Sequence, residues 1–199
     1  YSPNGTILFD WVHSPGGDYA NVADEANSIA VDHDGNYVVA GYYTSESRAW
    51  EWYVVKLSSN GSVLWNWTQT GATSSDAAYS VAVDQDGNYV VGGNTYLGLI
   101  SWHVVKIASN GTTLWNFSQS QSTGKAYGVA VDQDNNYVIV GYASGGWRLM
   151  KMRPNSTLLW NYTIGMGVAD VANSVAVDQD GNYVVVGDYD NPGPSDYDW

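Results

Sequence analysis

Paired aspartates recur four times along the chain and raise the question of cation binding. Each pair stands in an Asp-x-Asp pattern, and a glycine follows in three of the four copies. The pairs are Asp32/Asp34, Asp84/Asp86, Asp132/Asp134 and Asp178/Asp180. A calcium loop uses such carboxylates, but the remaining oxygen ligands and the closing glutamate are missing here. We therefore expect these aspartates to cap their own turns, and we assign no metal site to them.

A second acidic set is formed by Asp24, Asp76 and Asp170, each of which stands four residues before a predicted inner strand. Such carboxylates could ring one mouth of a central channel and hold calcium or another cation, although Gly124 takes this place in the third copy. The alternative is a structural role in the loop. The repeated lysines are expected to pair with aspartates of their own repeat; they are Lys56, Lys106 and Lys151.

Catalytic chemistry has little support in the sequence. His13, His33 and His103 share no motif, and there is no nucleophile elbow, zinc-protease helix motif or phosphate loop. Glycoside hydrolysis needs two carboxylates, and only the aspartate pairs could supply them. We therefore predict a protein that is not an enzyme and that needs no cofactor.

Asparagine-linked glycosylation is the modification that the sequence suggests. Seven asparagines stand in Asn-x-Ser/Thr sequons: Asn4, Asn60, Asn66, Asn110, Asn116, Asn155 and Asn161. For Asn4, Asn60 and Asn110 the alternative is a simple turn residue. Asn66, Asn116 and Asn161 lie on predicted outer strands between aromatic residues, and alternation along a strand turns them away from the aromatic face. These three are the stronger glycosylation candidates.

Aromatic residues are abundant, with ten Trp and sixteen Tyr. Those that recur in every repeat are expected to pack between neighbouring sheets. Aromatics that do not recur are candidates for stacking on sugars, and we place them in loops at one rim: Tyr42, Tyr43, Trp50, Tyr96 and Tyr142.

The charge of the chain limits its partners. Seven basic residues stand against twenty acidic ones, for a net charge of −13. Nucleic acids and anionic lipid surfaces are bound through clustered lysine and arginine, so neither is expected as a partner. No apolar run approaches the length needed to span a bilayer, so membrane insertion is not expected either. The chain has no cysteine, and a domain of this size can form its core without disulfides.

The elements that carry these residues come from one repeat. Four segments align, with their first aspartates 46 to 52 residues apart: SIAVDHDGNYVVAGY, SVAVDQDGNYVVGGN, GVAVDQDNNYVIVGY and SVAVDQDGNYVVVGD. Each unit contains four β-rich runs divided by Asp-Gly-Asn or Asn-Gly turns. Units of this length with four strands are typical of propeller blades. The sequence thus predicts an all-β, four-bladed β-propeller with four-stranded antiparallel blades.

The ends of the chain suggest how the ring closes. Residues 1–13 match an outer strand, and residues 173–199 match the first part of a unit. We predict one domain with blades at about 27–70, 79–120 and 127–165, and a composite blade closed by the N-terminal strand. The composite blade lacks four residues that correspond to Tyr53–Lys56. A shortened strand, a strand donated by a neighbouring molecule, and a chain cut from a longer protein are the open explanations.

The pattern Ala-Val-Asp-x-Asp-Gly-Asn-Tyr-Val-Val, followed by Trp-x-Val-Val-Lys and an Asn-Gly turn, resembles the propeller repeat of secreted and cell-surface bacterial and archaeal proteins. The resemblance covers nearly the whole chain. It implies a propeller scaffold in an extracellular or cell-surface setting and implies no catalytic residues.

From these features we expect a non-catalytic extracellular module with a structural or adhesive role in a cell-surface layer, sheath or filament. Its expected partners are other copies of itself, surface proteins or glycans. The alternative is a lectin-like propeller that binds carbohydrate through the rim aromatics.

Overall fold

The computed structural model describes residues 2–7, 9–12, 24–47, 49–69, 76–119, 123–165, 170–190 and 197–198. Every regular element in these residues is a β-strand, and neighbouring strands pair antiparallel. No helix in this part of the chain is both long and apolar enough to cross a bilayer. The predicted all-β class is therefore confirmed.

The first three sheets have the expected four strands in sequence order. Sheet 1 contains β1–β4, sheet 2 contains β5–β8 and sheet 3 contains β9–β12. Their bounds are β1 Glu25–Val31, β2 Tyr37–Thr44, β3 Trp50–Leu57, β4 Val63–Gln69, β5 Ala77–Val83, β6 Tyr89–Tyr96, β7 Ile100–Ile107, β8 Thr113–Gln119, β9 Gly124–Val131, β10 Tyr137–Ala143, β11 Gly146–Met152 and β12 Leu158–Ile164.

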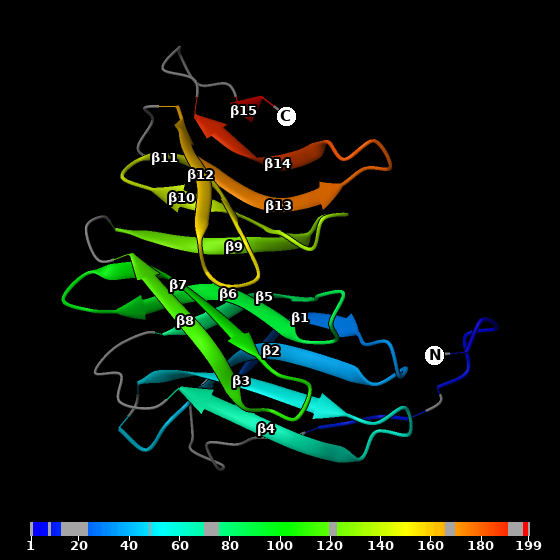
Figure 1. The fold of residues 1–199 in the computed structure, drawn as a ribbon. Coiled ribbons are helices and arrows are strands. Elements are labelled where there is room, and N and C mark those ends of the chain that lie inside the picture. Colours follow the sequence, from blue (N-terminus) through cyan, green and yellow to red (C-terminus); the bar gives the residue numbers. More distant parts are fainter. Residues whose placement is uncertain are drawn as a thin grey trace.

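Sheet 4 has three strands: β13 Val171–Val177, β14 Tyr183–Asp190 and the short β15 Tyr197–Asp198. The four sheets follow one another from sheet 1 at the bottom of Figure 1 to sheet 4 at the top. Within the described residues, the N-terminal segment forms no strand and joins no sheet. Closure of a four-bladed ring thus stays a prediction, and Tyr1, Leu8 and Trp199, on which it also depended, lie outside the described residues.

The core consists of three layers, one between each pair of consecutive sheets. Between sheets 1 and 2 it contains Val38, Trp52 and Val54 from the first sheet and Tyr89 and Ile107 from the second, and all five are 0% exposed. Equivalent clusters join sheet 2 to sheet 3 and sheet 3 to sheet 4. The central strands of sheets 2 and 3 are therefore covered on both faces, which explains why their sequences are almost continuously apolar.

The hairpin turns follow the expected chemistry. Gly87 has a φ of 77°, a left-handed conformation that glycine adopts without steric cost. In the third repeat Asn135 takes this place with a φ of 64°. Asparagine is among the few other residues that tolerate this region, so the substitution keeps the same turn.

Candidate functional site

The Asp-x-Asp turns are built around the first aspartate of each pair. Asp84 Oδ1 accepts the backbone N–H groups of Asp86 and Asn88 at 3.0 and 2.8 Å, and the same two bonds occur at Asp132 and Asp178. The aspartate thereby satisfies two donors that the tight turn leaves without a ladder partner. The interpretation that these aspartates cap their own turns is confirmed.

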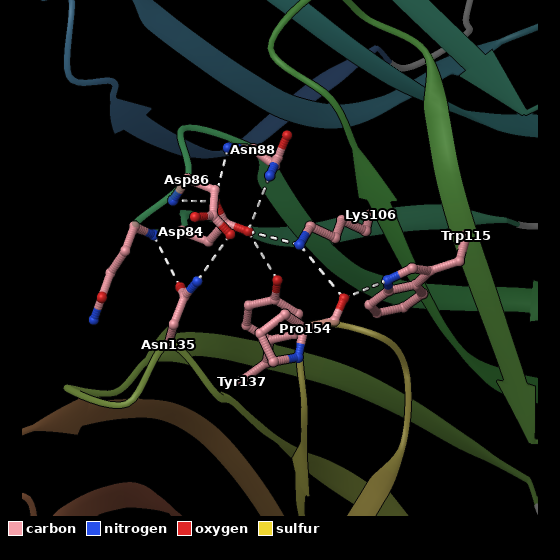
Figure 2. A network of polar contacts seen from close by, with 9 residues as sticks. Asp84, Asp86, Asn88, Lys106, Trp115, Asn135, Tyr137 and Pro154 are labelled. Carbon is pink, nitrogen blue, oxygen red and sulfur yellow. Dashed lines mark hydrogen bonds and ion pairs between the residues drawn. The ribbon is translucent and has the colours of Figure 1, made fainter.

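The second carboxylate oxygen of Asp84 meets the Lys106 ammonium group and the Tyr137 hydroxyl (Figure 2). Lys106 Nζ lies 2.9 Å from Asp84 Oδ2, and the Tyr137 hydroxyl of the next sheet donates to the same oxygen at 2.8 Å. Lys106 also donates to the Pro154 carbonyl, which in turn accepts the Trp115 indole N–H. The ion pair is thus tied to sheet 3 by two residues.

Burial and hydrogen bonding shift the pKa of Asp84, which is 0% exposed, in opposite directions. Burial favours the protonated acid, but hydrogen bonds from Lys106, the Asn88 amide and Tyr137 outweigh it and hold the pKa of Asp84 below its usual value. Burial and the bond to Asp84 raise the pKa of Tyr137. At neutral pH the site is an ionised aspartate paired with a lysine cation, beside a neutral phenol.

The same pair recurs in two other sheets. Lys56 contacts Asp32 at 2.8 Å and Lys151 contacts Asp132 at 2.8 Å, which confirms the predicted pairing within each repeat. The partner tyrosine again comes from the following sheet: Tyr89 donates to Asp32, and Tyr183 donates to Asp132. In the described residues of sheet 4, Asp178 has neither a lysine nor a tyrosine partner. The repeated charges therefore join sheets, and their geometry offers no open catalytic position.

The acidic residues before the inner strands also bind protein atoms. Asp76, 2% exposed, accepts the Thr95 hydroxyl and the Tyr96 amide, each at 2.8 Å. Burial raises the pKa of Asp76 despite these two bonds. Asp24 accepts the Thr44 amide at 2.9 Å. Asp24 and Asp76 therefore accept backbone and hydroxyl donors of their own sheets. Among the described residues, no group of three or more His, Cys, Asp or Glu side chains could hold a metal.

His103 is the one described histidine that is buried, with 5% of its surface exposed. Its Nδ1 lies 2.7 Å from the Ser118 hydroxyl, and its ring meets Trp52 edge-on with centroids 5.1 Å apart. Burial lowers the pKa of His103 to about 4. It is therefore a neutral packing residue at pH 7. His33 lies in the first turn, and His13 lies outside the described residues.

The rim aromatics lie differently from their prediction. They were expected in loops, but all five belong to strand ends: Tyr42, Tyr43, Trp50, Tyr96 and Tyr142. The connections between these strands are short, so the rim aromatics pair within β2, β3, β6 and β10. The expectation that they lie in loops was therefore wrong.

The structure brings only some of these aromatics together. Tyr42 and Trp50 stack with centroids 4.6 Å apart, and the Tyr42 hydroxyl donates to Glu25 at 2.7 Å. Burial and Glu25 raise the pKa of Tyr42 to about 12. Tyr43 donates to Glu51, while Tyr96 is 41% exposed at the end of β6. Four of the five are thus partly or fully buried, and Tyr96 is the member whose surface is open.

The recurring aromatics pack between sheets, as predicted. Trp65 lies on Tyr89 of sheet 2 at 5.6 Å, and Phe9 lies on Tyr37 of sheet 1 at 5.6 Å. Trp115 and Trp160 repeat this contact one and two sheets further on. Phe9 thus occupies, against sheet 1, the position that Trp65 occupies against sheet 2.

All seven sequon asparagines are exposed. The side-chain oxygens of the turn asparagines accept backbone N–H groups two residues further on; the bonded pairs are Asn4–Thr6, Asn60–Ser62, Asn110–Thr112 and Asn155–Thr157. Asn66, Asn116 and Asn161 lie on the outermost strands β4, β8 and β12. The turn asparagines thus have a structural role, whereas the side chains of the three strand asparagines make no hydrogen bond to any other described residue.

A groove of about 860 Å³ runs between residues 9–12 and sheet 1. Phe9, Trp11 and Val12 line one side, while β1, β2 and β3 line the other. The sequence analysis did not single out this groove. The recurrence of an aromatic residue at Phe9 and Trp65 is the sequence signal that could have indicated it, because Trp65 packs on the following sheet.

Comparison with known families gives one match. Residues 33–63 match a family described as a domain of unknown function (DUF5122) beta-propeller. The matched part runs from the first Asp-x-Asp turn through β2 and β3 to the start of β4. No curated protein matches the chain. The match supports a β-propeller repeat and names no activity.

Proposed function

We propose that this chain is a non-catalytic extracellular module, with a structural or adhesive role in a cell-surface layer, sheath or filament. The proposal includes a secreted or cell-surface location, because the repeat pattern resembles that of secreted and cell-surface bacterial and archaeal proteins. Other copies of the chain, surface proteins or glycans are its proposed partners.

The main support is the placement of the strand sequons. Asn66, Asn116 and Asn161 are exposed at equivalent positions on the outermost strands of three sheets. A glycan needs an exposed acceptor with room around it, and these three residues meet that condition. A carbohydrate coat on the outer edge of these three sheets suits a protein that works outside the cell.

The polar residues that recur in each repeat support a role without catalysis. Asp32, Asp84 and Asp132 are all bound by lysine and tyrosine side chains, so their carboxylates have partners in the folded protein. A general acid or base must reach a substrate. These carboxylates instead hold neighbouring sheets together.

The proposed architecture repeats the four-stranded unit of the predicted propeller, with residues 9–12 as the outer strand beside a β13–β15 sheet. Phe9 supports this assignment, because its contact with Tyr37 repeats the contact of Trp65 with Tyr89.

Mass spectrometry of the protein from its native source tests the proposed setting. We expect peptides that contain Asn66, Asn116 or Asn161 to carry hexose-containing mass additions, and enzymatic or chemical removal of glycans should return the polypeptide mass. The bare polypeptide mass at all three sites would remove the main support for the proposal. Electron microscopy of the same material would show whether it belongs to a layer or filament.

A lectin-like function is the second candidate, and the tip between β6 and β7 favours it. Tyr96, Leu97 and Leu99 are 41%, 54% and 48% exposed there, so an aromatic face stands beside apolar surface. On a glycan array, specific binding that Tyr96→Ala removes and that Tyr43→Ala retains would favour this function. An array without any specific signal would exclude it for the glycans printed.

A further inference from the structure

The first strand of sheet 1 has an apolar face that is open to solvent. Ile29 and Val31 on β1 are 63% and 60% exposed. The residues at the position of Ile29 in sheets 2 and 3, Val81 and Val129, are 6% and 8% exposed. The groove described above lies over this face, and residues 9–12 border it.

The other sheets show what normally covers such a face. Val81 packs in one cluster with Val38, Ala40 and Val54 of the preceding sheet. One sheet further on, a Cβ placed on Gly92 would lie only 2.7 Å from Val129 Cγ2, so these two positions are in direct contact. The covering surface is therefore the central strand of the preceding repeat.

Strand β14 of sheet 4 exposes the same kind of covering surface. Val184 and Val186 on β14 are 54% and 57% exposed. Their equivalents in sheet 3, Val138 and Val140, are 0% exposed because the next sheet lies on them. The molecule thus has an uncovered receiving face at sheet 1 and an uncovered covering face at sheet 4.

Polar groups at the two faces match as well. Ser28 Oγ accepts the Val81 amide at 3.2 Å, and Ser80 Oγ accepts the Val129 amide at 3.1 Å. Ser174, the same position in sheet 4, is exposed. Tyrosines of sheets 2, 3 and 4 donate to the aspartate of the preceding sheet.

In the described residues, two members of this tyrosine–aspartate series remain unmatched. Tyr37 has no aspartate partner, and Asp178 has no tyrosine partner. Tyr37 lies on the receiving side of sheet 1, and Asp178 lies at the end of sheet 4 that would meet it. The two faces are therefore complementary in apolar surface and in hydrogen-bonding groups.

We propose that the β13–β14 face of a second copy of this chain docks into the groove of sheet 1, so that copies associate head to tail. Val186 of one copy would lie on Ile29 of the other. Ser174 Oγ would accept the Ile29 amide, and Tyr37 would donate to Asp178. Residues 9–12 would then flank the incoming β13–β14 as its outer strand.

The arrangement of the sheets favours a second copy over the same chain as the occupant. Sheets 1 and 4 stand at opposite ends of the stack (Figure 1). The three interfaces between them are already closed, with Val38, Val90 and Val138 each 0% exposed. Bringing sheet 4 onto sheet 1 of the same chain requires these interfaces to pivot, whereas docking a second copy leaves them unchanged. The inference rests on the proposed structural role and names its partner surface.

Cross-linking of mixed single-cysteine variants tests the contact directly, because the chain has no cysteine of its own. Ile29→Cys and Val186→Cys are purified separately, mixed, and oxidised in about 0.15 M salt, which screens repulsion between the acidic chains. We expect a disulfide-linked product of two chains that contains one copy of each variant. The matched control, Leu114→Cys mixed with Ile29→Cys, should give little product, because Leu114 is 50% exposed but lies on neither face.

Two results would overturn the proposal. One is the absence of a mixed product above the Leu114→Cys control. The other is a double variant, Ile29→Cys with Val186→Cys, that links mainly within one chain, which would assign the occupant to the same molecule.

Light scattering of the unmodified chain gives an independent measurement. We expect a mass of two or more chains that rises with concentration, and Val186→Asp should return the mass of one chain while Leu114→Asp does not. Identical masses for all three proteins would contradict the inference. Recombinant, unglycosylated chain is used, so failure to associate is distinguishable from failure of the glycan test on native material.

Discussion

Removal of the Lys106 cation is the most informative single perturbation of the polar network in Figure 2. Lys106→Met keeps a long apolar side chain but leaves Asp84 without its cation. The side chains of Lys106 and Asp84 are 5% and 0% exposed, so water cannot replace the lost partner. Tyr137 and the turn amides still donate to Asp84, but they carry no compensating charge.

Breaking a buried ion pair by removing one partner typically costs about 3–5 kcal/mol, because a charge remains buried and uncompensated. With a urea slope of about 2 kcal/mol per molar, a loss of about 4 kcal/mol lowers the unfolding midpoint by about 2 M. Lys151→Met should cost less, since the Lys151 side chain is 15% exposed and solvent screens its pair.

The assay is urea unfolding followed by tryptophan fluorescence at pH 7. Asp84→Asn combined with Lys106→Met should be more stable than Lys106→Met alone, because a neutral amide still accepts from the turn and no bare charge remains. Losses below about 1 kcal/mol for Lys106→Met, or equal losses for Lys106→Met and Lys151→Met, would refute the reasoning.

Three further predictions concern other positions. Between pH 6.5 and 4 the unfolded chain protonates His103 and the folded chain does not, so acidification should lower the free energy of unfolding by about 3 kcal/mol through this residue. The variant His103→Gln should lack this loss, and parallel plots of unfolding free energy against pH for the two proteins would contradict the prediction. Gly87→Val should cost more than about 1 kcal/mol in thermal or urea unfolding, because its φ is 77°, whereas Gly87→Asn should be tolerated; equal effects would refute the turn assignment. Tyr137→Phe should cost about 1.5–3 kcal/mol through the lost bond to Asp84, and an unchanged urea midpoint would argue against that bond.

Much of the fold could be predicted because the repeat carries local signals. The Asp-Gly-Asn turn, the apolar Tyr-Val strand and the lysine of the third strand recur with nearly constant spacing, and each has a local physical reason. The pairing of Lys56 with Asp32 also followed from the repeat, because one internal charge of each sign per unit has an obvious partner.

The relation between the ends could not be predicted in the same way. The repeat assigned residues 1–13 to a composite blade with residues 173–199. In the structure Phe9 packs on Tyr37 of sheet 1, but periodicity does not reveal whether sheet 4 of the same chain reaches that place. Closure depends on small rotations at each sheet interface, and these arise from side-chain packing rather than from periodicity. The loop assignment of Tyr42 failed for a similar reason, because strand length depends on pairing across the sheet.

The tyrosine that each aspartate receives from the following sheet couples neighbours in one direction along the chain. Asp32 depends on Tyr89, Asp84 on Tyr137, and Asp132 on Tyr183. Loss of a sheet thus weakens the one before it, as in other linear repeat arrays where stability is a sum of units and nearest-neighbour terms. Within the described residues Asp178 of sheet 4 receives no such tyrosine. In a chain that is not associated with a second copy, the amides of sheet 4 should therefore exchange with deuterium before those of sheets 2 and 3.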